Sequence, residues 1–106
     1  MSFAPHLEPP YYAVIFTNQL ADDTSGYEAT ADRMLMLAEQ QPGFLGVESV
    51  RDAQGFGITI SYWRDEESIW HWRRHAEHQL AQQEGKARWY EHYELRVAKV
   101  ERVGKR

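Results

Sequence analysis

The chain has 106 residues, of which 42% are hydrophobic and 26% are charged. This length suits a single domain, and the composition excludes a disordered, collagenous or low-complexity protein. Twelve basic against sixteen acidic residues give a net charge of −4, which argues against nucleic acid as a partner, and the absence of cysteine excludes disulfides and thiolate metal ligands.

The chain begins with a proline-rich stretch. Residues 1–10 hold three of the four prolines, so we expect an extended leader there, then one domain over residues 11–103 and a loose tail over residues 104–106. The leader has neither the basic nor the apolar part of a targeting signal, and no apolar run in the sequence is long enough to cross a bilayer. We therefore expect a soluble, cytoplasmic protein with no membrane partner.

A strand and a helix are predicted next. β-branched and aromatic residues dominate residues 11–20, and both faces of this predicted strand are mostly apolar. Ser25 and Glu28 match a capping box, which predicts a helix start at this point. Pro42 then predicts a helix end at about residue 41.

A hairpin and a second helix follow. Two antiparallel strands are predicted at residues 44–51 and 56–63, joined by a turn that contains Gly55. Asp65 is placed to cap the next helix, which the apolar stripe predicts as far as Gly85.

The last strand is predicted at residues 93–103, with a further helical turn as an option over residues 87–92. The order β-α-β-β-α-β predicts an α+β, ferredoxin-like fold, in which a four-stranded antiparallel sheet carries two helices on one face. Because the strands are apolar on both sides, we expect a second subunit to cover the other face of the sheet.

Three histidines of the second helix, His71, His75 and His78, share one side of that helix. Two histidines at this spacing can chelate a metal ion, but the glutamate of an H-E-x-x-H motif is missing. A side that faces solvent or a cleft is the simpler interpretation, so we expect no metal site.

The four tryptophans fall in the second half of the chain. Trp72 lies at the edge of the apolar stripe and close to His75 around the helix, so both side chains can line one pocket. For Trp63 and Trp89, core packing is favoured over substrate contact. Trp70 points away from the stripe, where a subunit contact and a substrate contact both stay open.

Asn18 is a polar residue on the same predicted strand face as Val14 and Phe16. A buried amide needs hydrogen-bond partners or a wet cavity, whereas an amide near a strand end can simply be exposed to solvent. Both interpretations stay open. The sequence has no G-x-S-x-G elbow and no glycine-rich phosphate loop, which argues against a serine hydrolase and a nucleotide-binding protein.

These features together resemble the antibiotic biosynthesis monooxygenase family. The likeness rests on the βαββαβ order, on the asparagine near the end of the first strand and on the run SYWRDEESIWHWRRHAEHQLAQQEGKARWYEHYELRVAKVER, and it extends over about residues 11–102. In that family two subunits pack sheet against sheet into a dimeric α/β barrel, and each keeps a pocket between its sheet and its helices. The resemblance therefore implies a homodimer through the open sheet face and a small aromatic molecule as ligand.

The family has two main groups of characterised members, cofactor-free oxygenases of quinone-forming aromatic compounds and haem-degrading monooxygenases. The haem degraders use an asparagine on the first strand and a tryptophan on the second helix, to which Asn18 and Trp72 correspond. Their iron ligand is a histidine ten residues after the tryptophan, where this chain has Gln82. His75 and His78 precede that position. The resemblance thus favours oxidation of a phenol-like or quinol-like molecule without a cofactor, with haem as the alternative.

In the cofactor-free reaction, the resemblance implies a base, donors for an anion and a dry aromatic cage. We assign the base to His75 or His78, and the donors to Asn18 and Trp72. The aromatic residues would supply a further donor and the cage. The catalytic candidates are Asn18, Trp72, His75 and His78. The substrate-binding candidates are Tyr62, Trp63, Trp89 and Tyr90. A dimer that binds a small ligand without turnover is the remaining alternative.

Overall fold

The computed structural model describes residues 3–4, 7–81 and 89–106, with the backbone alone over residues 77–81. The chain follows the predicted βαββαβ order. The elements are β1 (Tyr11–Leu20), α1 (Tyr27–Glu39), β2 (Phe44–Arg51), β3 (Phe56–Trp63), α2 (Glu66–Ala81) and β4 (Tyr90–Val100).

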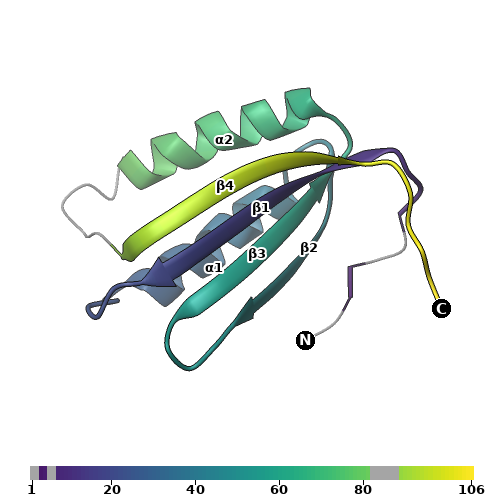
Figure 1. The fold of residues 1–106 in the computed structure, drawn as a ribbon. Helices are drawn as coiled ribbons and strands as arrows, with labels where there is room; N and C mark the ends of the chain where they lie inside the picture. The colour runs from purple at the N-terminus through teal and green to yellow at the C-terminus, as the bar shows by residue number, and fades with distance from the viewer. Residues whose placement is uncertain (1–2, 5–6, 82–88) are drawn as a thin grey trace.

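The four strands form one antiparallel sheet in the order β2-β3-β1-β4. β1 and β3 are therefore central, while β2 and β4 are the edges. Figure 1 shows the sheet from the face that carries no helix, with α1 behind it. The predicted α+β, ferredoxin-like fold is confirmed.

The core lies between the sheet and the helix layer. Val14 of β1 and Trp63 of β3 project from the same sheet face, because the register pairs Val14 with Ser61 and so places every second residue of β3 alongside it. Ala38 of α1 and Ile69 of α2 complete the buried cluster, so both helices cover this one face. We call it the helix face, and the opposite side the open face.

The start of α1 corrects the predicted capping box. The N-cap is Gly26, in a left-handed conformation with φ 81°, and no side chain caps the helix. Ser25 lies one residue too early, and its hydroxyl donates to Asp23 at 2.8 Å. The helix ends at Glu39, two residues before the predicted end, and Gln40 is its C-cap.

The bounds of β4 also differ from the prediction. The strand begins at Tyr90 because its first residues find partners at the far end of β1, and it ends at Val100 because Tyr11, the first residue of β1, is the partner there. The helical turn that the sequence allowed over residues 87–92 is wrong for residues 90–92, which are strand. Residues 87–88 lie outside the described part of the chain.

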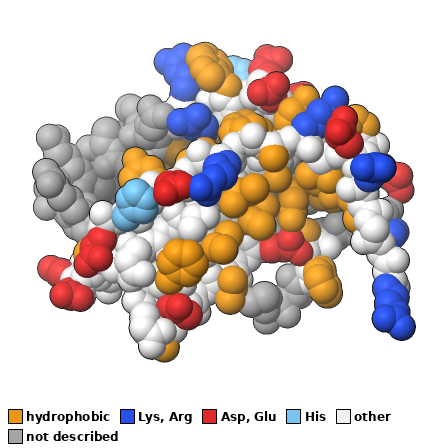
Figure 2. All heavy atoms as spheres, in the orientation of Figure 1, with side chains coloured by type: hydrophobic (Ala, Val, Ile, Leu, Met, Phe, Trp, Pro, Cys, Tyr) orange, Lys and Arg blue, Asp and Glu red, His pale blue; other side chains and the backbone are white. Residues whose placement is uncertain are grey.

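The open face carries an apolar band. Ile15, Ile58 and Ile60 lie on it, and Phe56 and Val50 extend it towards the hairpin with exposed fractions of 45% and 52%. Figure 2 shows hydrophobic side chains gathered over the middle of this side of the molecule. Neither helix covers this face.

The leader contacts the open face through Ala4. The backbone amide of Ala4 donates to the carboxylate of Glu48. Glu48 is on β2 and pairs with Ile60 of β3, so it lies on the open face. Tyr62 donates to the same carboxylate at 2.6 Å. Within the described residues, no helix is long and apolar enough to cross a membrane.

Candidate functional site

Three neighbouring aromatic rings connect β3 to α2 on the helix face. Trp63 is fully buried, and the ring of Trp72 stacks on it with centroids 6.2 Å apart. His75 lies one helical turn further along α2, and its ring is 5.9 Å from that of Trp72. The spacing of three residues on a helix brings both side chains to one side, as the sequence predicts.

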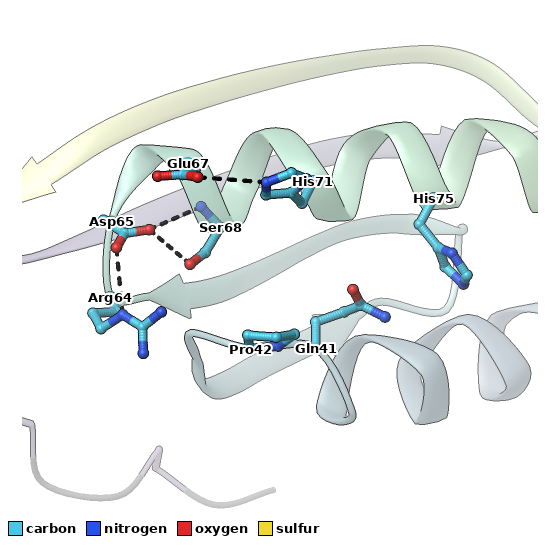
Figure 3. Close-up of a pocket in the computed structure, with 8 residues that line it drawn as sticks. All are labelled: Gln41, Pro42, Arg64, Asp65, Glu67, Ser68, His71 and His75. Atoms are coloured by element: carbon cyan, nitrogen blue, oxygen red, sulfur yellow. Dashed lines mark hydrogen bonds and ion pairs between the residues drawn. The ribbon is translucent and has the colours of Figure 1, made fainter.

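The position of α2 is set by the cap that the sequence predicts. Asp65 accepts hydrogen bonds from the backbone amide and the hydroxyl of Ser68, at 2.8 and 2.6 Å. These bonds, led by the one from the hydroxyl, lower the pKa of Asp65. Figure 3 shows this cap beside the end of α1.

A groove of about 560 Å³ separates the first turns of α2 from the end of α1. Figure 3 shows His75 pointing from α2 into the space between the helices. The Nε2 atom of His75 is buried and has no hydrogen-bond partner. Most of the lining is polar or charged, and its members are Gln41, Pro42, Arg64, Asp65, Glu67, Ser68, His71 and His75.

His71 differs from His75 in its surroundings. Its side chain is 60% exposed and lies 3.6 Å from the carboxylate of Glu67. The backbone of His78 is part of α2, but its side chain lies outside the described part of the chain. Among the described residues, His, Cys, Asp and Glu side chains form no group of three that could hold a metal ion.

Asn18 is buried, with only 2% of its surface exposed, so the solvent-exposed interpretation is wrong. Its Nδ2 makes one long hydrogen bond, 3.5 Å, to the carbonyl oxygen of Phe16. Its Oδ1 has no partner. A buried amide with an unsatisfied oxygen and spare donor capacity is unusual, because leaving such atoms unpaired costs free energy.

Asn18 belongs to a row of residues that crosses the sheet. The registers pair Arg51 with Gly57, Gly57 with Asn18, and Asn18 with Tyr93. All four positions therefore lie on the helix face. The guanidinium group of Arg51 lies over Gly57, with Cζ only 2.7 Å from the point where a Cβ atom would stand. The sequence alone does not point to Arg51, because its place in the row with Asn18 comes from the pairing of three strands.

Aromatic rings surround this end of the sheet. Phe16 makes edge contact with Tyr90 at 5.2 Å, and Tyr27 contacts both Trp89 and Tyr90 at 5.8 Å. Burial, followed by the hydrogen bond to Tyr27, raises the pKa of Tyr90. Tyr90 therefore stays a neutral phenol that can donate a hydrogen bond at physiological pH.

On the helix face, the side chains of β4 are exposed to solvent. Tyr93, Leu95 and Val97 are 58%, 39% and 43% exposed, although they lie beside Asn18, Phe16 and Val14. These apolar side chains form a wall next to the buried amide. The sequence does not indicate this role, because the pattern of β4 is that of an ordinary strand.

The predicted site residues fall into separate groups. Trp63, Trp72 and His75 are the three neighbouring rings, while Asn18 and Tyr90 lie at the hairpin end of the same face. The described contacts do not join the two groups.

Three substrate-binding candidates have other contacts. Tyr62 lies on the open face, where it donates to Glu48, so the structure separates it from the other candidates. Trp89 is buried and donates to the carbonyl oxygen of Ser25 at 2.9 Å. Trp63 is fully buried. Core packing is thus confirmed for both tryptophans.

Comparison with known proteins identifies the family. Residues 10–84 match the family model described as antibiotic biosynthesis monooxygenase. The chain belongs to the antibiotic biosynthesis monooxygenase family. It is 59% identical over 95 residues to YqjZ, an uncharacterised protein of Bacillus subtilis strain 168. The match covers 90% of this chain and 83% of that protein.

Solved structures share the fold of this monooxygenase-family chain at low identity. A variant of SnoaB, a cofactor-independent oxygenase from Streptomyces nogalater, has a TM-score of 0.69 and 13% identity, over 88% of this chain and 95% of that one. A variant of MhuD with two manganese protoporphyrin IX molecules per active site has a TM-score of 0.65 and 17% identity, over 89% of this chain and 99% of that one. At such identities the likeness shows the fold alone.

Proposed function

We propose that this protein is a monooxygenase that oxidises a phenol-like or quinol-like aromatic molecule without a cofactor. The observation that carries the proposal is Asn18, a buried amide on the helix face whose Nδ2 makes one long hydrogen bond and so has a second hydrogen to donate to an anion. Family membership and the fold shared with a cofactor-independent oxygenase support the same reaction class. The exposed apolar side chains of β4 provide a surface against which an aromatic molecule can lie.

The reaction balances without an external reductant. In an anthrone, for example, a base removes one proton from the methylene carbon, and the resulting enolate reacts with O₂ to form a hydroperoxide. Loss of water then leaves a carbonyl group. One oxygen atom enters the product and the other leaves in the water, so O₂ itself takes up the four electrons that the substrate loses.

The site residues then have defined roles. His75 or His78 is the base, and the unpartnered Nε2 atom of His75 supports its availability. Asn18 and Trp72 are donors to the anion, and the neutral phenol of Tyr90 is a further donor. Trp63 and Trp89 hold the surrounding elements in place rather than touch the substrate.

The test uses a hydroxyanthrone, whose oxidation to the anthraquinone changes its visible spectrum. We expect uptake of one O₂ per product, with one labelled oxygen atom in the quinone. Asn18→Ala and the variant of the basic histidine should lower kcat by about 100-fold. His71→Ala is the matched control, because His71 is exposed and paired with Glu67. Unaltered turnover in both His75→Ala and His78→Ala contradicts the assignment of the base.

Haem is the second candidate, and one observation favours it. Nε2 of His75 is buried and unpartnered, so no hydrogen bond within the protein competes for its lone pair. The groove that His75 borders presents apolar and polar surface in about equal measure, so its lining does not argue against a porphyrin. A haemin titration tests this alternative. A Soret shift that is lost in His75→Ala or His78→Ala, but kept in His71→Ala, would support it.

The protein is further proposed to form a homodimer through its open face, where the apolar band is left uncovered by either helix. A dimer that binds the aromatic molecule but consumes no O₂ would show a binding protein instead of an enzyme.

A further inference from the structure

Arg51 carries a positive charge that no carboxylate in the described part of the chain contacts. Its Nη1 donates to the carbonyl oxygen of Gly55 at 2.6 Å, and its Nη2 donates to the hydroxyl of Tyr27 at 3.0 Å. Both acceptors are neutral. The neighbouring carboxylate, that of Asp52, accepts backbone amides of the hairpin instead. A partly buried guanidinium without an anionic partner is costly, so its presence calls for a reason.

The guanidinium group reaches towards Asn18 because Gly57 leaves room for it. Gly57 lies between Arg51 and Asn18 in the cross-sheet row, and the guanidinium carbon and both Nη atoms lie within 3.0 Å of the position of a Cβ there. Neighbouring strands are about 4.8 Å apart, so the charge lies about one strand away from the buried amide. Any side chain at position 57 would displace it.

Asn18 has unused hydrogen-bonding capacity. Its single described bond is the long one from Nδ2 to Phe16, and an amide nitrogen has a second hydrogen to donate. Tyr93, the neighbour of Asn18 on β4, is 58% exposed, so the row is open at that end. A cation, an unsatisfied amide and an exposed aromatic ring therefore follow one another across the sheet.

We propose that Arg51 and Asn18 together bind the deprotonated oxygen of a phenolic ligand, while Tyr27 holds Arg51 in place. The proposal rests on the proposed function, in which the anion is the form that reacts with O₂. A guanidinium group fixed beside the anion stabilises it without reorganising. Within the described part of the chain, the other ionisable groups that face this place are the phenols of Tyr27, Tyr90 and Tyr93.

The probe is 4-nitrophenol, because its phenolate absorbs visible light and its neutral form does not. We expect the wild-type protein to bind the phenolate more tightly than the neutral phenol, so the pKa of the bound probe falls below that of the free probe. In Arg51→Gln, phenolate binding should weaken about 10- to 100-fold, while binding of the neutral form is unchanged. Arg73→Gln removes an equal charge from an exposed position of α2 and should bind the phenolate like the wild type.

A second variant tests the same site in case Arg51→Gln does not fold. Asn18→Asp keeps the size of the side chain but places a carboxylate beside Arg51. The new pair should keep the protein folded and abolish the preference for the phenolate. Circular dichroism and the melting temperature report the fold of each variant.

The outcomes separate this inference from the oxygenase proposal. Phenolate binding that depends on Arg51, without O₂ uptake from the hydroxyanthrone, supports the anion site and contradicts the oxygenase. Equal weakening of both probe forms in Arg51→Gln, or a wild-type protein without preference for the phenolate, overturns the anion site, and Arg51 is then a support of the hairpin and Tyr27 only.

Discussion

Trp63 holds the sheet and both helices together through one side chain. Its indole Nε1 donates to the hydroxyl of Ser61 at 2.8 Å, and its ring contacts Phe44 and Trp72. Trp70 is a natural comparison, because it lies on the same helix as Trp72 but is 53% exposed. Its ring contacts Arg74 instead of the core.

Replacing these two tryptophans should have very different effects. Trp63→Ala removes a fully buried ring and is expected to lower the free energy of unfolding by about 3–5 kcal/mol. Trp70→Ala should cost less than about 1 kcal/mol. Urea denaturation followed by circular dichroism measures both. Equal losses would contradict the placement of Trp63 at the centre of the core.

Glu48 and Tyr62 form a pair whose strength depends on pH. The hydrogen bond from Tyr62, followed by the one from the Ala4 amide, lowers the pKa of Glu48. Burial, followed by the hydrogen bond to Glu48, raises the pKa of Tyr62 to about 12. The depressed pKa of Glu48 stabilises the fold above its unfolded value of 4.5, and this stabilisation is lost as the pH falls through the folded value. The raised pKa of Tyr62 stabilises the fold below its unfolded value of 10, and this is lost as the pH rises towards 12.

Glu48→Gln should therefore destabilise the protein at neutral pH by about 1 kcal/mol, and the difference from the wild type should shrink below pH 4.5. Melting temperatures measured across this range give the result. Glu39→Gln, at an exposed position of α1, is the control for a general charge effect. A difference that stays constant with pH would exclude Glu48 as the cause.

At the scale of elements, the sequence predicted β1, β2 and β3 to the residue, because their apolar patterns end at prolines, glycines or charged turns. The bounds of β4 were wrong because they depend on the register with β1, which no local pattern contains. The same limit applies to the site. Helical spacing predicted that Trp72 and His75 come together. Arg51 and Asn18, by contrast, are 33 positions apart and lie in one cross-sheet row only through strand pairing.

The turn between α1 and β2 packs closely against the start of α2. Gly43 has φ 87°, and a Cβ atom there would stand 2.1 Å from the hydroxyl oxygen of the buried Ser68. Its carbonyl oxygen also accepts the amide of Arg64 at 2.8 Å. This turn therefore fits directly against the capped start of α2.

Gly43→Ala is expected to destabilise the protein by about 2–4 kcal/mol, since it adds backbone strain and an overlap with a buried side chain. Gly55→Ala is the matched comparison. It has φ 91°, but its nearest neighbour is the flexible end of Gln19 at 3.1 Å, so the loss should be about 1–2 kcal/mol. Chemical denaturation ranks the two variants. The reverse ranking would show that the start of α2 tolerates a side chain at position 43.

At the scale of the whole molecule, the sheet divides the chain into two unlike halves. The helix face carries the buried core and the unsatisfied Asn18, whereas the open face carries an apolar band with no helix over it. Fourteen aromatic residues are many for a core that fits between one sheet and two helices. A second copy on the open face would give the remaining apolar surface a partner.

The proposed homodimer predicts a mass in solution of twice the 12.5 kDa of the chain. Ile60→Lys places a charge in the middle of the open face and should shift the protein to the monomer. Leu35→Lys, at a residue of α1 that is 41% exposed, should leave the dimer intact. Size-exclusion chromatography with light scattering distinguishes these outcomes. A wild-type monomer at micromolar concentration would contradict the dimer.

The missing side chain of Gly57 couples two positions of the sequence. This glycine has no positive φ to require it, and the space where its Cβ would stand is filled by the guanidinium group of Arg51. Alanine at position 57 thus acts on Arg51 without touching it chemically, and the effects of changing both residues should not add. Relatives that carry a larger residue at position 57 are expected to have lost the arginine, so the two positions should vary together through evolution.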